Sequence, residues 1–302
     1  MTGHSSVQRG KSLAGYAAGI AAGVSYGMNP LFAKPLLAQG VEVSVMLFWR
    51  YLLAVGFMAI LMLAKRESFL LRKGQIPTVL LLGVLFCMSS LLLFESYKFI
   101  PSGLATTLVY LYPTLTAIIL LFCGVAPDPR TWLCIIATLA GVVLLCIPSG
   151  EIQLNAIGML LAAGSALCYA LYLIIINRSR RIESVSAHSI TFYSLCTGSV
   201  IFLAMRLSDG GSIISGLDSA GVWAELAGLA FFPTMVSLLT LAVSTRMIGP
   251  TKTGVLGVFE PLTAILIGTA AFGEPMTTTI LAGIVICVAA VAVMVSGGKH
   301  AG

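Results

Sequence analysis

Three charged residues lie inside long apolar stretches of the sequence: Arg50, Glu95 and Glu260. A charged group at the centre of a bilayer costs about 2.5–3.5 kcal/mol on insertion scales, so such a residue usually serves a function. Glu260 stands in the stretch GVLGVFEPLTAIL, directly before Pro261, which leaves the Gly257 carbonyl without its usual helical donor. A carboxyl group at that position can exchange a proton or bind a cationic group. The guanidinium of Arg50 can bind an anionic group such as a carboxylate.

Polar side chains at helical spacing in the same apolar stretches predict the lining of a small-molecule site. The candidate substrate-binding residues are Glu260, Arg50, Tyr26, Asn29, Tyr110, Thr106, Tyr169 and Gly257. Glu260 is also the candidate coupling group, and Pro113 and Pro261 are the candidate flexing points of their helices. A single tyrosine in such a stretch is more often an interfacial or packing residue, so the prediction depends on the whole set.

The composition indicates a membrane as the environment of these stretches. Of the 302 residues, 58% are hydrophobic and only 9% are charged, whereas soluble domains are about 25% charged. The mean hydropathy is +1.02. Apolar runs of roughly 18 or more residues recur along the chain, and each is long enough to cross a bilayer. The seven cysteines lack the spacing of metal ligands or of a disulfide framework, so we expect no metal and no cofactor.

The sequence predicts an all-α polytopic membrane protein with ten transmembrane helices, joined by short loops rich in glycine, proline and charge. The predicted spans are residues 12–33, 43–64, 76–98, 102–123, 130–148, 154–176, 187–206, 223–245, 251–272 and 277–296. Thirteen Lys and Arg residues fall on the side of the N-terminus and three on the other side, which predicts a cytoplasmic N-terminus. Ten spans return the C-terminus to the same side, so residues 1–11 and 297–302 are expected to be cytoplasmic tails. The net charge of +6 therefore reflects topology, and no nucleic-acid partner is expected.

Two rows of small residues suggest an internal repeat. The first and sixth spans carry a small residue at every fourth position: Gly15, Gly19, Gly23 and Gly27, then Gly158, Ala162, Ala166 and Ala170. A shift of 143 residues superposes the two rows, and it also lays Tyr26 on Tyr169. A shift of 148 residues places the YP of span four on the EP of span nine. Rows of this kind let helices pack closely.

The two similar shifts predict a duplicated five-helix unit, residues 12–148 and 154–296. Because five is odd, the second unit enters the membrane from the opposite side, and the two units form inverted repeats. Such a pair can exchange two conformations and turn a site at the bilayer midplane from one side to the other.

The motifs in these stretches resemble a known family over almost the whole chain. The stretches FWRYLLAV, SGLATTLVYLYPTLTAIIL and TGVLGVFEPLTAILIGTAAFGEP are similar to the EamA-like branch of the drug/metabolite transporter superfamily. The resemblance implies a secondary-active transporter of a small metabolite in the cell inner membrane. It further implies export as the expected direction and amino acids as candidate substrates. Protons are the candidate coupling ion because the Glu260 carboxyl can gain and lose one. The oligomeric state stays open.

An enzyme is the alternative of a different class, and we do not expect one. The chain has no G-x-x-x-x-G-K-[ST] loop for nucleotide phosphates and no H-E-x-x-H motif for a catalytic zinc. An intramembrane enzyme acting on a lipid-linked or small amphipathic substrate would need two or more acidic or histidine side chains at one interface. Transport and enzymatic conversion are told apart by whether the solute crosses a vesicle membrane chemically unchanged.

Overall fold

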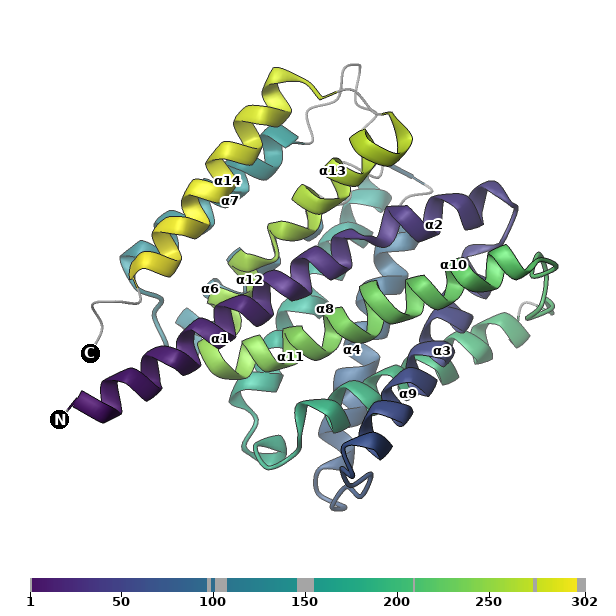
Figure 1. The fold of residues 1–302 in the computed structure, drawn as a ribbon, viewed down its shortest axis with the longest axis horizontal. Helices are drawn as coiled ribbons and strands as arrows, with labels where there is room; N and C mark the ends of the chain where they lie inside the picture. Colours follow the sequence, from purple (N-terminus) through teal and green to yellow (C-terminus); the bar gives the residue numbers. More distant parts are fainter. Residues whose placement is uncertain are drawn as a thin grey trace.

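The computed structural model of the chain describes residues 2–96, 99–100, 108–145, 155–208, 210–273 and 276–297. Within these ranges the chain is a bundle of helices connected by short turns (Figure 1). The helices are α1 (Thr2–Gly27), α2 (Asn29–Ala38), α3 (Val43–Ala64), α4 (Ile76–Ser96), α6 (Tyr112–Phe122), α7 (Pro129–Leu145), α8 (Ala156–Arg178), α9 (Ala187–Ser208), α10 (Ala220–Ala230), α11 (Ser237–Ile248), α12 (Pro250–Leu256), α13 (Phe259–Phe272) and α14 (Thr278–Gly297), with a 3₁₀ turn η1 (Arg180–Ile182) and a π-helical segment η2 (Phe231–Val236).

Six helical stretches in the described ranges are long and apolar enough to cross a membrane. They are Val43–Ala64, Ile76–Ser96, Ala156–Arg178, Ala187–Ser208, Ala220–Ile248 and Pro250–Phe272. Shorter apolar helices cover Tyr112–Phe122, Pro129–Leu144 and Thr278–Met294. The chain is therefore an all-helical, multi-pass membrane protein, while the number of ten spans stays a prediction.

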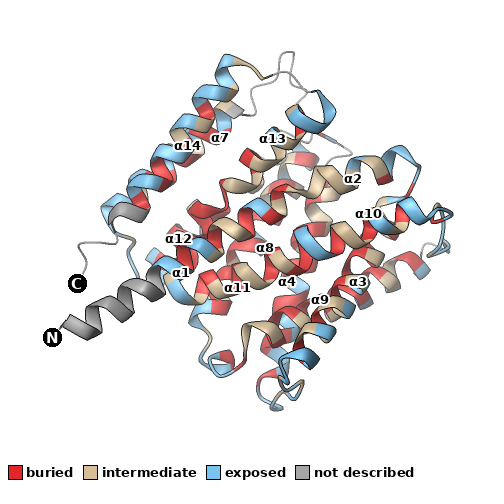
Figure 2. Ribbon diagram, viewed as in Figure 1, coloured by how far each residue is buried: buried red, intermediate tan, exposed pale blue. Residues whose placement is uncertain are grey.

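The outer surface of the bundle is apolar. Large hydrophobic side chains such as Leu133, Leu160 and Val285 are 63–73% exposed on the outward faces of their helices. Figure 2 shows buried residues gathered on the inner helices α8, α4 and α12, with exposed residues on the outside. Apolar side chains on the outside of a helical bundle are the expected surface toward lipid tails.

The closest-packed helix pairs each join the two halves of the chain. The pairs are α14 with α7, α1 with α11, α4 with α8, and α3 with α9. Figure 1 shows α14 beside α7 at one edge of the bundle and α3 beside α9 toward the opposite edge. Matching the spans of the two halves in order pairs α1 with α8, α3 with α9, α4 with α11 and α7 with α14. Exchanging the halves then converts the α1–α11 contact into the α4–α8 contact and leaves the other two contacts unchanged. The packing therefore has the pattern that a two-fold relation between the halves requires.

The first helix of each half runs in the opposite direction across the bundle. Gly15 of α1 lies against Met247 and Ile248 at the end of α11, and Gly19, one turn later, lies against Ser244, so α1 runs antiparallel to α11. The first helix of the second half, α8, contacts the end of α11 with its own end. There Asn177 Nδ2 donates a hydrogen bond to the Thr245 carbonyl at 3.0 Å. The start of α1 and the end of α8 therefore lie on the same side of the molecule.

Three of the predicted spans contain a change in helical geometry. Span one is divided at Met28 into α1 and α2, and span nine is divided at Gly257 and Val258 into α12 and α13. Span eight passes through the π-helical segment η2 between α10 and α11. The sequence analysis gave each of these segments as one span, and among the three it named a flexing point only in span nine, at Pro261. Prolines account for the difference, because each of the three segments carries one whose missing N–H removes a backbone hydrogen bond.

Candidate functional site at the helix breaks

The break in span nine places Glu260 at the start of a helix. Pro261 cannot donate to the Gly257 carbonyl, and that carbonyl instead accepts a tighter bond from the Glu260 N–H at 2.9 Å. Glu260 is therefore in the first turn of α13, where the helix dipole favours a negative charge. Pro261 lies in the same first turn, where proline is tolerated, so the bend falls at Gly257 and Val258, before the proline that the sequence analysis named as the flexing point.

Two tyrosines from the first half of the chain bind the backbone at this break. The Tyr110 hydroxyl donates to the Val255 carbonyl at 2.9 Å, and the Tyr112 hydroxyl donates to the Gly254 carbonyl at 3.0 Å. Both carbonyls lie in the last turn of α12, where they accept only the tighter bonds from the Gly257 and Val258 N–H groups and have room for a further donor. The hydroxyl groups therefore complete the hydrogen bonding of the broken helix, and they couple the two halves of the chain.

Gly257 belongs to this contact, because it provides space that Tyr112 fills. A Cβ atom placed on Gly257 would lie 1.6 Å from the Tyr112 Oη. Tyr112 also packs edge-on against Tyr169 of α8, with ring centroids 4.6 Å apart. Gly257 is thus a close-packing position in this arrangement, rather than an open surface for a ligand. The sequence analysis did not include Tyr112 in the site, although the 148-residue shift had placed it on Glu260.

The break in span one lies beside the break in span nine. A Cβ atom on Gly27 would lie 2.5 Å from the Glu260 carbonyl oxygen, so α1 and α13 touch at this point. The missing N–H of Pro30 leaves the Tyr26 carbonyl free, and Asn29 Nδ2 donates to it instead at 2.8 Å. The other amide atom, Asn29 Oδ1, is buried without a hydrogen-bond partner among the described residues. An acceptor of this kind can bind a ligand once the surrounding helices separate and expose it.

Arg50 reaches the π-helical segment of span eight. Its Nε donates to Thr234 Oγ1 at 2.6 Å, and its Nη2 donates to the Pro233 carbonyl at 3.4 Å. Thr234 Oγ1 in turn donates to the Leu229 carbonyl at 2.9 Å, which supplies the bond that the Pro233 ring cannot make. The guanidinium also lies 5.7 Å from the ring centroid of Tyr26, at the distance of a cation–π contact.

The Arg50 side chain is only 1% exposed, so in this arrangement it holds helices together rather than facing a cavity. The sequence analysis missed both of its partners, Pro233 and Thr234. The available signal was the Pro-Thr pair in the apolar stretch FFPTMV, because a proline inside a span frees a carbonyl and a neighbouring threonine can bind it. π-Helical segments occur often at functional sites.

Electrostatics link these groups into one site. The Glu260 carboxyl lies within electrostatic range of the phenol groups of Tyr26, Tyr110, Tyr112 and Tyr169. Of the predicted site residues, the structure brings together Tyr26, Asn29, Arg50, Tyr110, Tyr169, Gly257 and Glu260. Thr106 lies outside the described residues. Pro113 is the second residue of α6, so like Pro261 it stands in the first turn of a helix.

The chemistry of this site comes from one carboxyl group, one guanidinium and several phenols. No group of three His, Cys, Asp or Glu side chains gathers as metal ligands in the part of the chain that the structure describes. The carboxyl can take up a proton or bind an ammonium group, and the phenols and the Asn29 amide can form neutral hydrogen bonds. Such a set suits the recognition of a small polar molecule.

The model of the EamA-like transporter family matches the chain twice, over residues 13–147 and 156–296. The chain is 28% identical over 181 residues to an uncharacterized transporter of Archaeoglobus fulgidus, in a match covering 60% of this chain and 62% of that protein. It is 25% identical over 237 residues to the uncharacterized transporter YdfC of Bacillus subtilis, covering 77% of this chain and 76% of YdfC.

A third relative is an uncharacterized transporter of Synechocystis, 26% identical over 221 residues, with 70% of this chain and 64% of that protein covered. The chain thus spans less than two thirds of the Archaeoglobus and Synechocystis relatives. A solved crystal structure shares the fold with a TM-score of 0.80 over 93% of this chain and 96% of its own, at 18% sequence identity.

Proposed function

This chain belongs to the EamA-like transporter family, and from that premise we propose that it moves a small metabolite across the membrane by alternating access. The proposed transport is secondary-active, driven by a gradient, with Glu260 as the group that couples it to protons. The curated relatives carry the name of transporters, which agrees with the broad class of membrane transporter.

The observation that supports this proposal most is the meeting of the helix breaks. Transporters built from repeats commonly bind substrate and coupling ion where interrupted helices meet at the repeat interface. Here the α12–α13 break carries Glu260, the α1–α2 break lies beside it, and Tyr112 at the start of α6 contacts both Gly257 and the Gly254 carbonyl. Groups from both halves therefore surround one carboxyl.

The proposed architecture is a pair of inverted five-helix repeats, residues 12–148 and 154–296. Two features of the fold support it. The close-packed helix pairs keep their pattern when the halves are exchanged, and α1 and α8 run in opposite directions across the bundle. Exchange of conformations between the halves would then open the site alternately to the two sides.

The proposed substrates are amino acids, and the proposed direction is export from the cytoplasm. In this hypothesis Glu260 binds the ammonium group, and Arg50 uses the N–H groups that Thr234 and Pro233 do not take to bind the carboxylate. Because Arg50 and Tyr112 are each only 1% exposed, the helix breaks must separate before a solute can enter. The proposed location is the cell inner membrane, with both termini in the cytoplasm.

A transport screen tests the function directly. Purified protein in proteoliposomes is given pools of labelled metabolites, with protein-free vesicles and the Glu260→Gln variant as controls. The expected result is accumulation of at least one amino acid, chemically unchanged and dependent on a proton gradient. The proposal fails if no solute moves faster than in protein-free vesicles. Conversion of the solute into another compound would instead support the intramembrane enzyme.

A further inference from the structure

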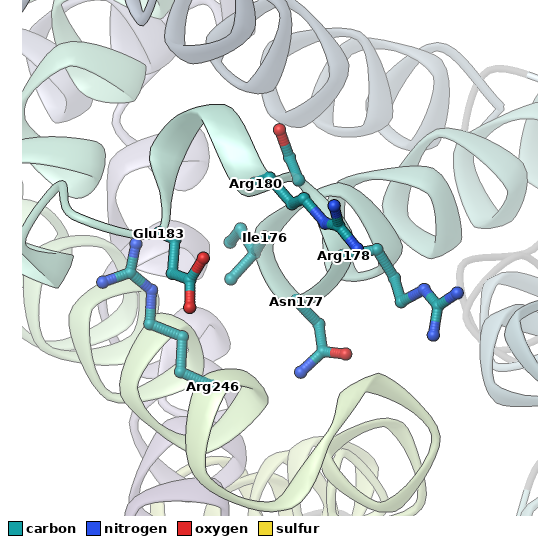
Figure 3. Close-up of a pocket in the computed structure, with 7 residues that line it drawn as sticks. Ile176, Asn177, Arg178, Arg180, Glu183 and Arg246 are labelled. Carbon is teal, nitrogen blue, oxygen red and sulfur yellow. The ribbon is translucent and has the colours of Figure 1, made fainter.

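A second polar region lies away from the helix breaks, between α8, α9 and α11. The structure contains a pocket of about 570 Å³ beside the end of α8, the turn that follows it and the end of α11 (Figure 3). Its lining residues are Ile176, Asn177, Arg178, Ser179, Arg180, Glu183 and Arg246. Three arginines and one glutamate are among these residues, so the net positive charge of the lining favours an anionic ligand. Figure 3 shows Arg246 on one side of the opening and Arg178 on the other.

Four hydroxyl groups lie next to this pocket, deeper in the bundle. Tyr172, Thr191, Ser194 and Thr245 are each 0% exposed, and their hydroxyl groups have no hydrogen-bond partner among the residues that the structure describes. A buried hydroxyl without a partner is costly, and native proteins contain few of them. Four such groups on three adjoining helices therefore indicate a ligand that supplies the missing partners.

The sequence positions of the four residues connect the hydroxyl groups to the pocket. Tyr172 precedes Ile176 by one helical turn, so both lie on one face of α8. Thr245 directly precedes Arg246, and its carbonyl accepts a hydrogen bond from Asn177 Nδ2 at 3.0 Å. Ile176, Asn177 and Arg246 all line the pocket.

The remaining two hydroxyl groups lie on α9, facing Tyr172. The Tyr172 hydroxyl lies near the Ser194 hydroxyl and within electrostatic range of the Arg246 guanidinium. Thr191 precedes Ser194 by three residues and shares its helix face. Arg246 also donates to the Ile182 carbonyl at 3.0 Å, so its position beside the pocket is fixed by the α8–α9 turn.

The deep end of this region continues toward the helix breaks. The ring of Tyr172 stacks on that of Tyr169, with centroids 6.4 Å apart and an interplanar angle of 8°. Tyr169 in turn packs against Tyr112 and interacts electrostatically with Glu260. A row of tyrosines thus leads from the buried hydroxyl groups to the candidate substrate site.

We propose that the pocket and the four buried hydroxyl groups form an entry subsite for the compact oxyanion, a carboxylate or a phosphate, of a soluble solute on its way to Glu260. This proposal rests on the proposed transport function. Hydroxyl groups and guanidinium N–H groups are donors, and oxyanions accept several such bonds at once. The hydroxyl groups remain unpaired until the solute arrives. They then donate hydrogen bonds to its oxyanion in place of the water molecules that the oxyanion has lost.

Binding of simple oxyanions tests the subsite without any transport. The protein is placed in nanodiscs of neutral phosphatidylcholine, and its thermal unfolding midpoint is measured in sodium phosphate, sodium acetate and sodium chloride at equal ionic strength. We expect phosphate or acetate to raise the midpoint relative to chloride, because a ligand that binds only the folded state stabilises it. The rise should disappear in Tyr172→Phe and in Ser194→Ala.

The matched control is Tyr193→Phe, because the Tyr193 hydroxyl already donates to the Phe69 carbonyl outside this cluster. This variant should have a lower midpoint in every salt and keep the full response to oxyanions. Tyr172→Phe should lose the response without a lower midpoint in chloride, since it removes a hydroxyl that has no partner. Equal responses in the wild type and Tyr172→Phe, or no response of the wild type to either oxyanion, would overturn the subsite.

A second arm distinguishes a solute from a lipid headgroup. If anionic phosphatidylglycerol in the nanodisc raises the midpoint of the wild type but not of Tyr172→Phe, and soluble oxyanions have no effect, the occupant is a lipid and the entry role is wrong. Once a transported solute is known, Tyr172→Phe should raise its half-saturating concentration on the side of the pocket. An unchanged value there would refute the subsite while leaving the transport function intact.

Discussion

The Tyr112 hydroxyl occupies the space beside Gly257 that any other residue would fill with its own side chain. A Cβ on Gly257 would lie 1.6 Å from the Tyr112 Oη and 3.0 Å from the Gly254 carbonyl oxygen, which accepts the Tyr112 hydrogen bond. Because Tyr112 lies in the first half of the chain and Gly257 in the second, this contact joins the two halves at the break of span nine.

Gly257→Ala should therefore disrupt the site. The added methyl group must displace the Tyr112 ring, which breaks its bond to Gly254, and overpacking of this kind costs about 1–3 kcal/mol. We expect a lower unfolding midpoint and a loss of transport, measured on purified protein and in proteoliposomes.

The Gly257→Ala/Tyr112→Phe double variant checks the cause. Phenylalanine lacks the oxygen that clashes most closely, so the double variant should recover part of the midpoint lost in Gly257→Ala. Independent, additive losses in the two single variants would contradict the contact as described.

Gly23→Leu should impair folding or transport, because α1 packs tightly against α12 and α13 at this position. A Cβ on Gly23 would lie 2.9 Å from the Phe259 Cβ and 3.1 Å from the Leu256 carbonyl oxygen. Gly56 on α3 provides the matched control, since a Cβ there would meet nothing within 4 Å. Expression and flux should fall for Gly23→Leu and stay normal for Gly56→Leu. Equal behaviour of the two variants would remove the packing argument.

Much of the helical framework could be predicted from hydrophobicity alone. The second predicted span, 43–64, coincides with α3, and the predicted small-residue rows do meet neighbouring helices, since Gly23 contacts Phe259 and Ala166 is fully buried. These features depend on local composition, which the sequence contains in full. The contacts that stabilise a helix break do not. Pro261 indicated a disturbance at the Gly257 carbonyl, and the break does fall there, but no local pattern shows that Tyr110 and Tyr112 of the other half bind the adjoining turn.

Arg50 illustrates the same limit for the candidate site. A charge inside a span indicates an interior position, and Arg50 is indeed buried. Its partner Thr234 lies 184 residues away in the sequence, and no local pattern connects the two. The Pro233 ring creates the free carbonyl that orients Thr234, so the partner follows from the three-dimensional packing of spans two and eight.

Thr234→Val should weaken the contact between α3 and the π-helical segment. The substitution keeps the shape of the side chain, removes the acceptor for Arg50 Nε and removes the donor for the Leu229 carbonyl. Leaving buried polar groups unpaired costs about 1–3 kcal/mol, so the unfolding midpoint should fall. Thr234→Ser keeps the hydroxyl and should retain most of the stability. A midpoint for Thr234→Val equal to that of Thr234→Ser would show that these hydrogen bonds contribute little.

The proposed orientation predicts which loops face outward. Ser212 lies in the loop between α9 and α10, and Ser179 lies at the end of α8. With a cytoplasmic N-terminus, a cysteine introduced at Ser212 should react with a membrane-impermeant maleimide in intact cells. A cysteine at Ser179 should react only after permeabilisation. The reverse pattern would invert the proposed topology.

Glu260→Gln tests the carboxyl around which the site is built. Glutamine keeps the size and hydrogen bonding of glutamate but cannot ionise, so the variant should fold normally. If Glu260 couples transport to protons or binds an ammonium group, gradient-driven flux should fall by about tenfold or more, equivalent to about 1.4 kcal/mol. Glu225→Gln is the control, because Glu225 on α10 bonds to Gln39 outside this site. Glu260→Asp, which can still ionise, should retain part of the flux and its dependence on pH. Wild-type flux and pH dependence in Glu260→Gln would show that ionisation of this carboxyl has no part in transport.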